Sequence, residues 1–196
     1  MTEGQRLTLL IGGARSGKSA LAERLARATS RPVVLLATME PHDAEVRHRI
    51  AAHRAARAVD WRTIEEPVAV IETLRQHVDD GETIILDCMT MWVSNLIMRL
   101  LPATPAAVEN QDHAIASAID AASGLVDWAV SREGEVVVVT NEVGSGVVPS
   151  YELGRVFRDA LGRANAVVAA RADRVYHLTA GLAIELKSLG ARPVDE

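Results

Sequence analysis

The sequence is poor in cysteine, in aromatic residues and in long apolar runs. Cys88 is the only cysteine among 196 residues, which excludes an intrachain disulfide and a cysteine-based metal cluster. Aromatic residues make up only 3% of the chain, so the core must consist mainly of Ala, Val, Leu and Ile. No apolar run reaches the length of a signal-peptide core or of a membrane span. We therefore expect a cytoplasmic protein without membrane insertion.

Positive charge is also in short supply, since the formal net charge is -5. Phosphate backbones attract basic surfaces, so this balance argues against a general nucleic-acid binder. Apolar residues make up 48% of the chain and charged residues 24%, which is typical of a globular protein. The length fits one domain, which we expect to span residues 1–196.

Apolar runs rich in β-branched residues alternate with longer segments of helical character. The expected strands are Leu7–Ile11, Val33–Ala37, Thr83–Asp87, Glu135–Thr140 and Arg174–Leu178, with a further edge strand at Ala183–Lys187. The expected helices are Lys18–Ala28, Asp43–Arg57, Val68–His77, Met89–Leu101, Val108–Ser131 and Tyr151–Arg171. This alternation predicts an α/β fold with a mostly parallel sheet covered on both faces. Ligands of such sheets collect at the carboxyl ends of the strands.

A glycine-rich segment follows the first expected strand and opens a helix. Residues 12–19, GGARSGKS, fit the phosphate-loop pattern GxxxxGK[ST], and the strand–helix context argues against a chance match. The loop's backbone N–H groups and the helix dipole would hold phosphate oxygens. Lys18 would reach the β- and γ-phosphates, and the Ser19 hydroxyl would bind Mg²⁺. The predicted nucleotide-binding residues are Gly12, Gly13, Ala14, Arg15, Ser16, Gly17, Lys18 and Ser19. The fold expected is therefore a P-loop NTPase-type three-layer sandwich.

Asp87 ends the apolar strand Thr83–Asp87. An acidic residue in this position is the Walker B arrangement, in which the carboxylate binds Mg²⁺ directly or through water. The alternative is that Asp87 caps the helix that begins near Met89. The phosphate loop favours the metal role, so Ser19 and Asp87 are the predicted metal ligands.

A histidine lies in the basic helix expected at Asp43–Arg57. Arg49 and Arg57 stand one turn on either side of His53. Neighbouring cations disfavour the imidazolium, so His53 should tend to the neutral form that can act as a nucleophile. The same arginines could hold the charges of an attacked phosphate. From the pattern alone, a partly solvated basic helix with an incidental histidine is the favoured interpretation.

In order along the chain, these features resemble the bifunctional adenosylcobinamide kinase / adenosylcobinamide-phosphate guanylyltransferase family of cobalamin biosynthesis. The matching segments are residues 12–19, Ala37-Thr38, Arg49-Ile-x-x-His53 with Arg57, Trp61-Arg-Thr-x-Glu65, residues 87–96 (DCMTMWVSNL), residues 140–149 (TNEVGSGVVP), Phe157-Arg-Asp and Gly162-Arg-x-Asn165. The resemblance covers nearly the whole chain and is much more specific than the phosphate loop alone.

The resemblance implies two reactions. In the family, the matching histidine attacks the α-phosphate of GTP, releases pyrophosphate and carries GMP as a phosphoramidate. The GMP then passes to adenosylcobinamide phosphate and gives adenosylcobinamide-GDP. The same protein phosphorylates the hydroxyl of adenosylcobinamide with ATP or GTP. The resemblance also implies a homotrimer.

The resemblance assigns the catalytic roles to His53 and Lys18. It adds further nucleotide-site residues, namely Ala37, Thr38, Met39, Arg54, Ala55, Ala56, Arg57, Glu65 and Asp87. Two rival functions stay open: a P-loop small-molecule kinase in which His53 is a bystander, and a nucleotide-binding regulatory switch without transfer chemistry. For Asn141 and Glu142, loop hydrogen bonding and a role in substrate or metal binding are equally favoured.

Overall fold

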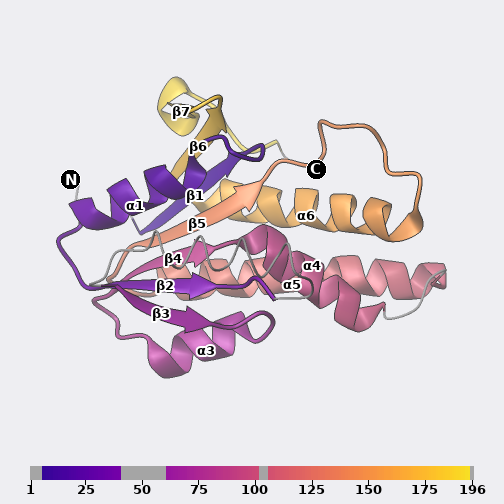
Figure 1. The fold of residues 1–196 in the computed structure, drawn as a ribbon, viewed down its shortest axis with the longest axis horizontal. Coiled ribbons are helices and arrows are strands. Elements are labelled where there is room, and N and C mark those ends of the chain that lie inside the picture. Colours follow the sequence, from indigo (N-terminus) through magenta and orange to yellow (C-terminus); the bar gives the residue numbers. More distant parts are fainter. Residues whose placement is uncertain (1–5, 41–60, 102–105, 195–196) are drawn as a thin grey trace.

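The fold is that of a computed structural model, which describes residues 6–40, 61–101 and 106–194. Within these residues a seven-stranded sheet has the strand order β3-β2-β4-β5-β1-β6-β7 (Figure 1). The strands are β1 (Leu7–Gly12), β2 (Val33–Ala37), β3 (Arg62–Glu65), β4 (Thr83–Asp87), β5 (Val136–Asn141), β6 (Arg174–Thr179) and β7 (Leu182–Glu185). Neighbouring strands run parallel, except that β7 is antiparallel to β6.

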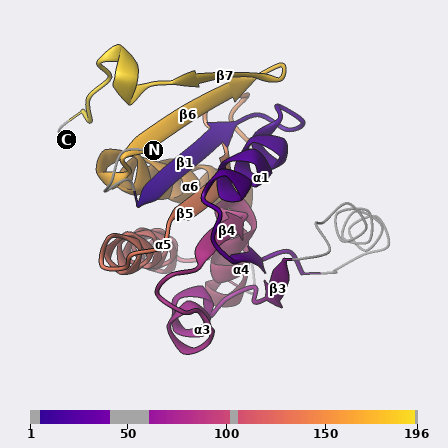
Figure 2. The same cartoon turned by 90° about the vertical axis from the view of Figure 1, so that its left-hand side faces the viewer.

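Helices cover both faces of the sheet. The described helices are α1 (Lys18–Ala28), α3 (Val70–His77), α4 (Met89–Leu100), α5 (Val108–Val130), α6 (Glu152–Arg171) and the short 3₁₀ helix η1 (Lys187–Leu189). Figure 2 shows α1 on one side of the sheet and α5 and α6 on the other. None of the helices in the described ranges is long and apolar enough to cross a membrane.

Two hydrophobic clusters lie between the sheet and the helices that cover its two faces. On the α1 face, Leu21 of the helix packs with Leu10, Ile85 and Val139 of the sheet. A larger cluster on the opposite face joins the sheet to α3, α4, α5 and α6, and Trp92 is its largest fully buried side chain. Parallel strands that are buried on both faces carry continuous apolar runs, which explains why the sequence pattern locates them so directly.

The predicted fold class is confirmed, and most expected elements differ from the observed ones by no more than two residues at either end. The expected edge strand at Ala183–Lys187 is present as β7, displaced toward the N-terminus and paired with β6. The expected helix Asp43–Arg57 lies outside the described residues.

Strand β3 is not among the strands that the sequence predicts. Its residues pair with β2 from Val34 to Ala37, yet three of the four are exposed and Ile64 is its single apolar side chain. A short edge strand needs little apolar surface, since it is paired on one side only. Such a strand leaves no apolar alternation for sequence analysis to detect.

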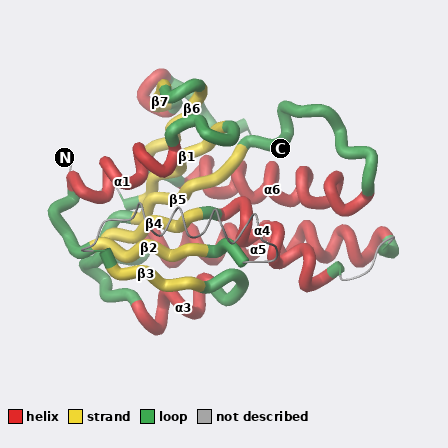
Figure 3. The backbone as a smooth tube through the Cα atoms, viewed as in Figure 1, coloured by secondary structure: helices red, strands yellow, loops and turns green. Residues whose placement is uncertain are grey.

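The parallel arrangement brings the carboxyl ends of six strands to one edge of the sheet. Figure 3 shows the loops that leave the strands at this edge. The predicted loop of residues 12–19 follows β1 here, and Asp87 and Asn141 end β4 and β5 at the same edge. The candidate site lies along this edge.

Candidate active site

The phosphate loop joins β1 to α1 and depends on its first glycine. A Cβ atom at Gly12 would lie 2.2 Å from the carbonyl oxygen of Leu178 in β6, so a larger residue would push the two strands apart. The backbone then passes through positive φ at Arg15 (57°) and Gly17 (99°). Such conformations turn successive N–H groups inward and form an anion-binding concavity. The local geometry therefore agrees with phosphate binding.

The ammonium group of Lys18 is held at this loop by backbone carbonyl groups. Its Nζ donates to the carbonyl oxygens of Gly12 at 2.9 Å and Gly13 at 2.6 Å, and it lies 3.4 Å from the Ser16 hydroxyl. The side chain is only 8% exposed. Burial lowers the pKa of Lys18, while the charges of Cys88 and Asp87 act in the opposite direction. A cation is thus held where phosphate oxygens would meet the loop.

Asp87 faces the same side of the sheet as the phosphate loop. It pairs in register with Ala37 on one side and Val139 on the other, and paired residues of parallel strands share a face. Ile85 and Val139 pack in the α1 cluster, so the Asp87 side chain belongs to the α1 face as well. Helix α1 begins with Lys18 and Ser19 on that side. The two predicted metal ligands therefore share one face at one edge.

The donor chemistry of Ser19 and Asp87 fits Mg²⁺. A hydroxyl and a carboxylate are hard oxygen ligands, and protein-bound Mg²⁺ usually takes its remaining ligands from phosphate and water. Within the described ranges, no group of three or more His, Cys, Asp or Glu residues gathers to bind a metal alone.

Thr38 connects the ends of two strands. Its side chain is fully buried, and its hydroxyl donates to the Cys88 carbonyl at 2.7 Å and accepts from the Cys88 N–H at 3.0 Å. Its own backbone N–H donates to the Asp87 carbonyl at 3.1 Å. Thr38 therefore helps to fix the position of Asp87. The predicted nucleotide contacts of Ala37, Thr38 and Met39 stay predictions.

Asn95 of α4, which lies within the matching segment of residues 87–96, is a structural residue that sequence reasoning missed. Its Nδ2 donates to the carbonyls of Thr38 at 2.8 Å and Pro67 at 3.0 Å, and it is 1% exposed. Asn95 thus connects the segment after β2 to the loop after β3. The available signal was an amide on a mostly apolar buried face of α4, where Thr90 is the other polar residue.

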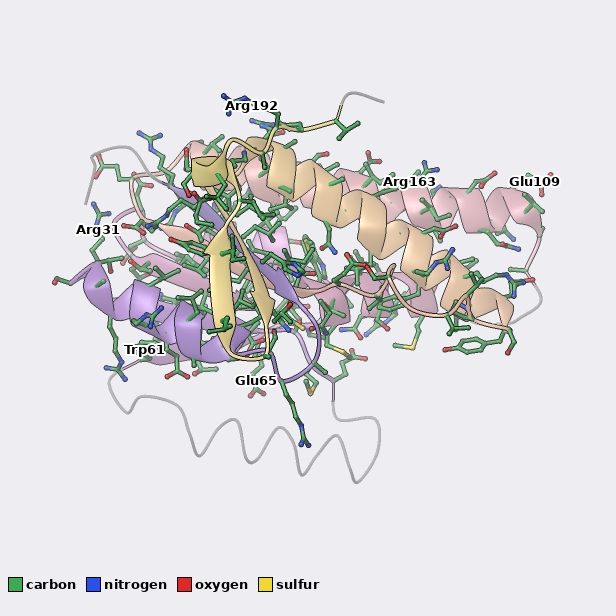
Figure 4. All side chains as sticks on the ribbon, turned by 90° about the horizontal axis from the view of Figure 1, so that it is seen from above. Arg31, Trp61, Glu65, Glu109, Arg163 and Arg192 are labelled. Carbon is green, nitrogen blue, oxygen red and sulfur yellow. The ribbon has the colours of Figure 1, made fainter. Side chains whose placement is uncertain are left out.

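Glu65 is the last residue of β3 and lies at the same edge. It pairs with Ala37, so it shares the α1 face with Asp87. Figure 4 labels Glu65 and also Trp61, the residue directly before β3. The side chain of Glu65 is exposed, and its predicted contact with the nucleotide stays a prediction.

The carboxylate of Glu142 stabilises its own loop. Its Oε1 accepts from the backbone N–H groups of Gly144 at 2.5 Å and Ser145 at 3.0 Å. The structure therefore shows that the Glu142 side chain makes hydrogen bonds within its own loop. In Asn141, the residue before it, the hydrogen bonds to Thr90 and Asn165 are made by the backbone.

The remaining predicted residues fall in one segment. His53, Arg54, Ala55, Ala56 and Arg57 lie outside the described residues. Their assignment as nucleophile and nucleotide-site residues stays a prediction from the sequence.

Comparison with known proteins identifies the family. Residues 8–186 match the family described as cobinamide kinase / cobinamide phosphate guanyltransferase, CobU. The chain belongs to this family. The CobU family comprises bifunctional enzymes that are both kinases and guanylyltransferases, so this chain is an enzyme of that bifunctional class.

Two curated relatives have nearly the same length as this chain. The bifunctional adenosylcobalamin biosynthesis protein CobP of Pseudomonas aeruginosa is 40% identical over 179 residues, which is 91% of this chain and 96% of the relative. The bifunctional adenosylcobalamin biosynthesis protein CobU of Escherichia coli is 37% identical over 182 residues, or 92% and 99% of the two chains. The predicted family is confirmed.

Solved structures of distant proteins show the same architecture as this CobU-family chain. A Pyrococcus horikoshii OT3 protein aligns with a TM-score of 0.52 at 10% identity, covering 94% of this chain and 87% of its own. An ATPase of the type III secretion system of pathogenic bacteria aligns with a TM-score of 0.53 at 14% identity, covering 89% and 52%. At such identities the likeness shows the fold alone, and it agrees with a P-loop α/β fold.

Proposed function

We propose that this chain phosphorylates adenosylcobinamide and then guanylylates the product, as a step of cobalamin nucleotide-loop assembly. The kinase step would use ATP or GTP, and the second step would use GTP. The central observation is the ammonium of Lys18 held in the loop of a chain that belongs to the CobU family. The family match supplies the two classes of reaction, and the loop supplies the phosphate site.

In the kinase step, the substrate hydroxyl oxygen attacks the γ-phosphorus of the bound nucleotide. The bond to the β-phosphate oxygen breaks, a nucleoside diphosphate leaves and the hydroxyl proton is released. Lys18 and the loop N–H groups would hold the phosphate oxygens, and positioned positive charge stabilises the charge that develops on them. Ser19 and Asp87 would hold Mg²⁺, which neutralises charge on the phosphates when bound.

In the guanylyl step, a ring nitrogen of His53 attacks the α-phosphorus of GTP and pyrophosphate leaves. A phosphate oxygen of adenosylcobinamide phosphate then attacks the same phosphorus, and the N–P bond breaks to release adenosylcobinamide-GDP. A neutral imidazole is required for the first attack, and the arginines predicted near His53 favour that form. Arg54 and Arg57 belong to the same proposed nucleotide site.

The decisive experiment follows label from GTP. The protein is incubated with Mg²⁺ and GTP labelled at the α-phosphate, and acid-labile, base-stable label on the protein is measured. We expect the label in the wild type and its loss in His53→Ala. The matched control is His48→Ala, which changes a histidine of the same predicted helix and should keep the label.

Each rival function has its own outcome in this experiment. Transfer of γ-label to adenosylcobinamide without any α-label on the protein would indicate a kinase in which His53 is a bystander. Binding of GTP without either transfer would indicate a regulatory switch. The Lys18→Ala variant should lose both activities, and retention of both would contradict the role proposed for the loop.

We further propose that the enzyme works in the cytoplasm and that three copies of the chain form a homotrimer. Each chain would form a single domain. The support is the family resemblance and the absence of a membrane-spanning helix among the described residues. A measurement of the mass in solution tests the oligomeric state.

A further inference from the structure

Asn141 ends β5, the strand that lies between the phosphate-loop strand β1 and the Asp87 strand β4. It pairs in register with Gly12, the first residue of the phosphate loop. Two residues earlier, Val139 pairs with Asp87. Residues two apart on a strand share a face, so Asn141 lies on the same α1 face as Val139 and Asp87. It therefore stands at the strand tip between the loop and the predicted metal ligand.

The backbone of Asn141 is held by side chains from two other elements, α4 and α6. Its N–H donates to Thr90 Oγ1 of α4 at 2.7 Å, and its carbonyl accepts from Asn165 Nδ2 of α6 at 3.1 Å. Thr140 Oγ1 donates to Asn165 Oδ1 at 2.8 Å and lies 3.3 Å from Thr90 Oγ1. Because Thr140 uses its one proton on Asn165, Thr90 must be the donor to Thr140.

These bonds form a closed ring that starts and ends on the backbone of Asn141. Thr90, Thr140 and Asn165 are 6%, 0% and 5% exposed, so the ring is buried in a core that is otherwise mainly aliphatic. Buried polar groups are costly unless they are paired, and here the ring pairs them. The result is a rigidly positioned strand tip rather than a loose loop start.

The side chain of Asn141 takes no part in this ring. No hydrogen bond from its amide to another described residue is present, and the residue is partly exposed at the site edge. A neutral amide can donate to a phosphate oxygen without adding a charge beside Asp87 or a metal ion. Lys18, bonded to the carbonyl of Gly12, marks the neighbouring position where the loop would hold the outer phosphates.

We propose that the side-chain amide of Asn141 donates a hydrogen bond to the terminal phosphate of a nucleoside triphosphate in the loop, so that the site distinguishes triphosphate from diphosphate. Thr90, Thr140 and Asn165 act as positioning residues for this contact. The inference rests on the nucleotide site proposed above and identifies the residue that recognises the γ-phosphate in it.

The test measures the affinities of two analogues that cannot transfer GMP, α,β-methylene-GTP and α,β-methylene-GDP. Both are titrated calorimetrically into the full chain with Mg²⁺ and without corrinoid, so that no reaction occurs. Asn141→Ala should reduce the preference for the triphosphate analogue by about tenfold or more, because hydrogen bonds to charged groups are strong. Its affinity for the diphosphate analogue should stay within about twofold of the wild type.

A matched control changes the same residue type elsewhere. Asn110 lies beside Glu109, which Figure 4 shows at the outer tip of α5. Asn110→Ala should keep the full triphosphate preference. The variant Asn141→Asp places a carboxylate at the proposed contact and should lower triphosphate affinity further than Asn141→Ala does.

The outcomes separate this proposal from the one on which it rests. A wild type that binds neither analogue would overturn both. A wild type that binds both, together with an Asn141→Ala variant of unchanged preference, would overturn the role of Asn141 alone. An equal loss of affinity for both analogues would also overturn it, because a purely structural residue affects them alike.

Discussion

The thiol of Cys88 follows Asp87 directly in the chain, and its surroundings suppress its ionisation. Burial and the Asp87 carboxylate raise the pKa of the thiol to about 11, against an ordinary value of 9.0. The thiolate is the reactive form of cysteine. The thiol of Cys88, the one cysteine of the chain, should therefore react slowly with electrophiles.

We expect Cys88 to react slowly with iodoacetamide at pH 8. A pKa raised from about 9 to about 11 lowers the thiolate fraction roughly a hundredfold at this pH, and the rate should follow. Alkylation measured by intact mass should accelerate with each rise in pH until the pKa is reached. The urea-unfolded protein is the reference, and equal rates in the folded and unfolded states would contradict the prediction.

The hydroxyl of Thr38 provides a second prediction at this scale. Thr38→Val keeps the shape but leaves the Cys88 N–H without its partner, whereas the Cys88 carbonyl still accepts from Trp92. An unpaired buried donor costs about 1–3 kcal/mol, so the free energy of unfolding should fall by that amount. Urea denaturation measures the change.

The matched control for Thr38→Val is Thr63→Val. Thr63 is exposed on β3, one strand away from Thr38, so the same substitution there should change the unfolding free energy by less than about 0.5 kcal/mol. A change in the unfolding free energy of less than about 0.5 kcal/mol for Thr38→Val as well would contradict the proposed contribution of its hydrogen bonds.

At the scale of elements, helix α6 carries a glycine that nothing in its surroundings requires. Gly162 lies in the helix interior, and a Cβ atom there would meet no atom within 4 Å. Glycine costs a helix about 0.5–1 kcal/mol relative to alanine, because its unfolded backbone is freer. The residue therefore permits a stabilising substitution.

Gly162→Ala should raise the free energy of unfolding by about 0.5–1 kcal/mol. The change corresponds to about 1–4 °C in Tm for a chain of this size and is measured by thermal denaturation. Gly124→Ala in α5 is the comparison, since its Cβ would lie 2.9 Å from Ile71 Cδ1 and the gain should be offset. A larger gain at Gly124 than at Gly162 would contradict the argument.

The elements also show what the sequence could predict about this fold. Strands β1, β2, β4 and β5 are buried on both faces, so their apolar runs stand out without any knowledge of their partners. Strand β3 is held by pairing with β2 and carries few apolar side chains, so its existence depends on a neighbour that the local sequence does not specify. Local burial was predictable, whereas dependence on a partner was not.

The same division applies to the candidate site. The phosphate loop was predictable because its chemistry depends on consecutive backbone groups and one lysine. The contacts of Asn95, and the ring of Thr90, Thr140 and Asn165, join elements that are far apart in sequence. Spacing along one element does not predict such contacts, which follow from the packing of helices against strand ends.

At the scale of the whole molecule, the proposed homotrimer predicts a mass. Sedimentation equilibrium should give three times the chain mass of 21.1 kDa over a range of protein concentrations. Leu182 and Ile184 of the edge strand β7 are 74% and 51% exposed, and an assembly that covers such apolar surface would be stabilised. A constant mass of one chain would contradict the trimer.

The position of β1 in the sheet has a consequence for biosynthesis. Its two neighbours, β5 and β6, lie more than a hundred residues further along the chain, so the strand that carries the phosphate loop is the first to be synthesised and among the last to be paired. A nascent chain that ends before Val136 has neither neighbour. The ability to retain a nucleotide should therefore emerge late in translation, after Leu178 has left the ribosome and the sheet can close around the first strand.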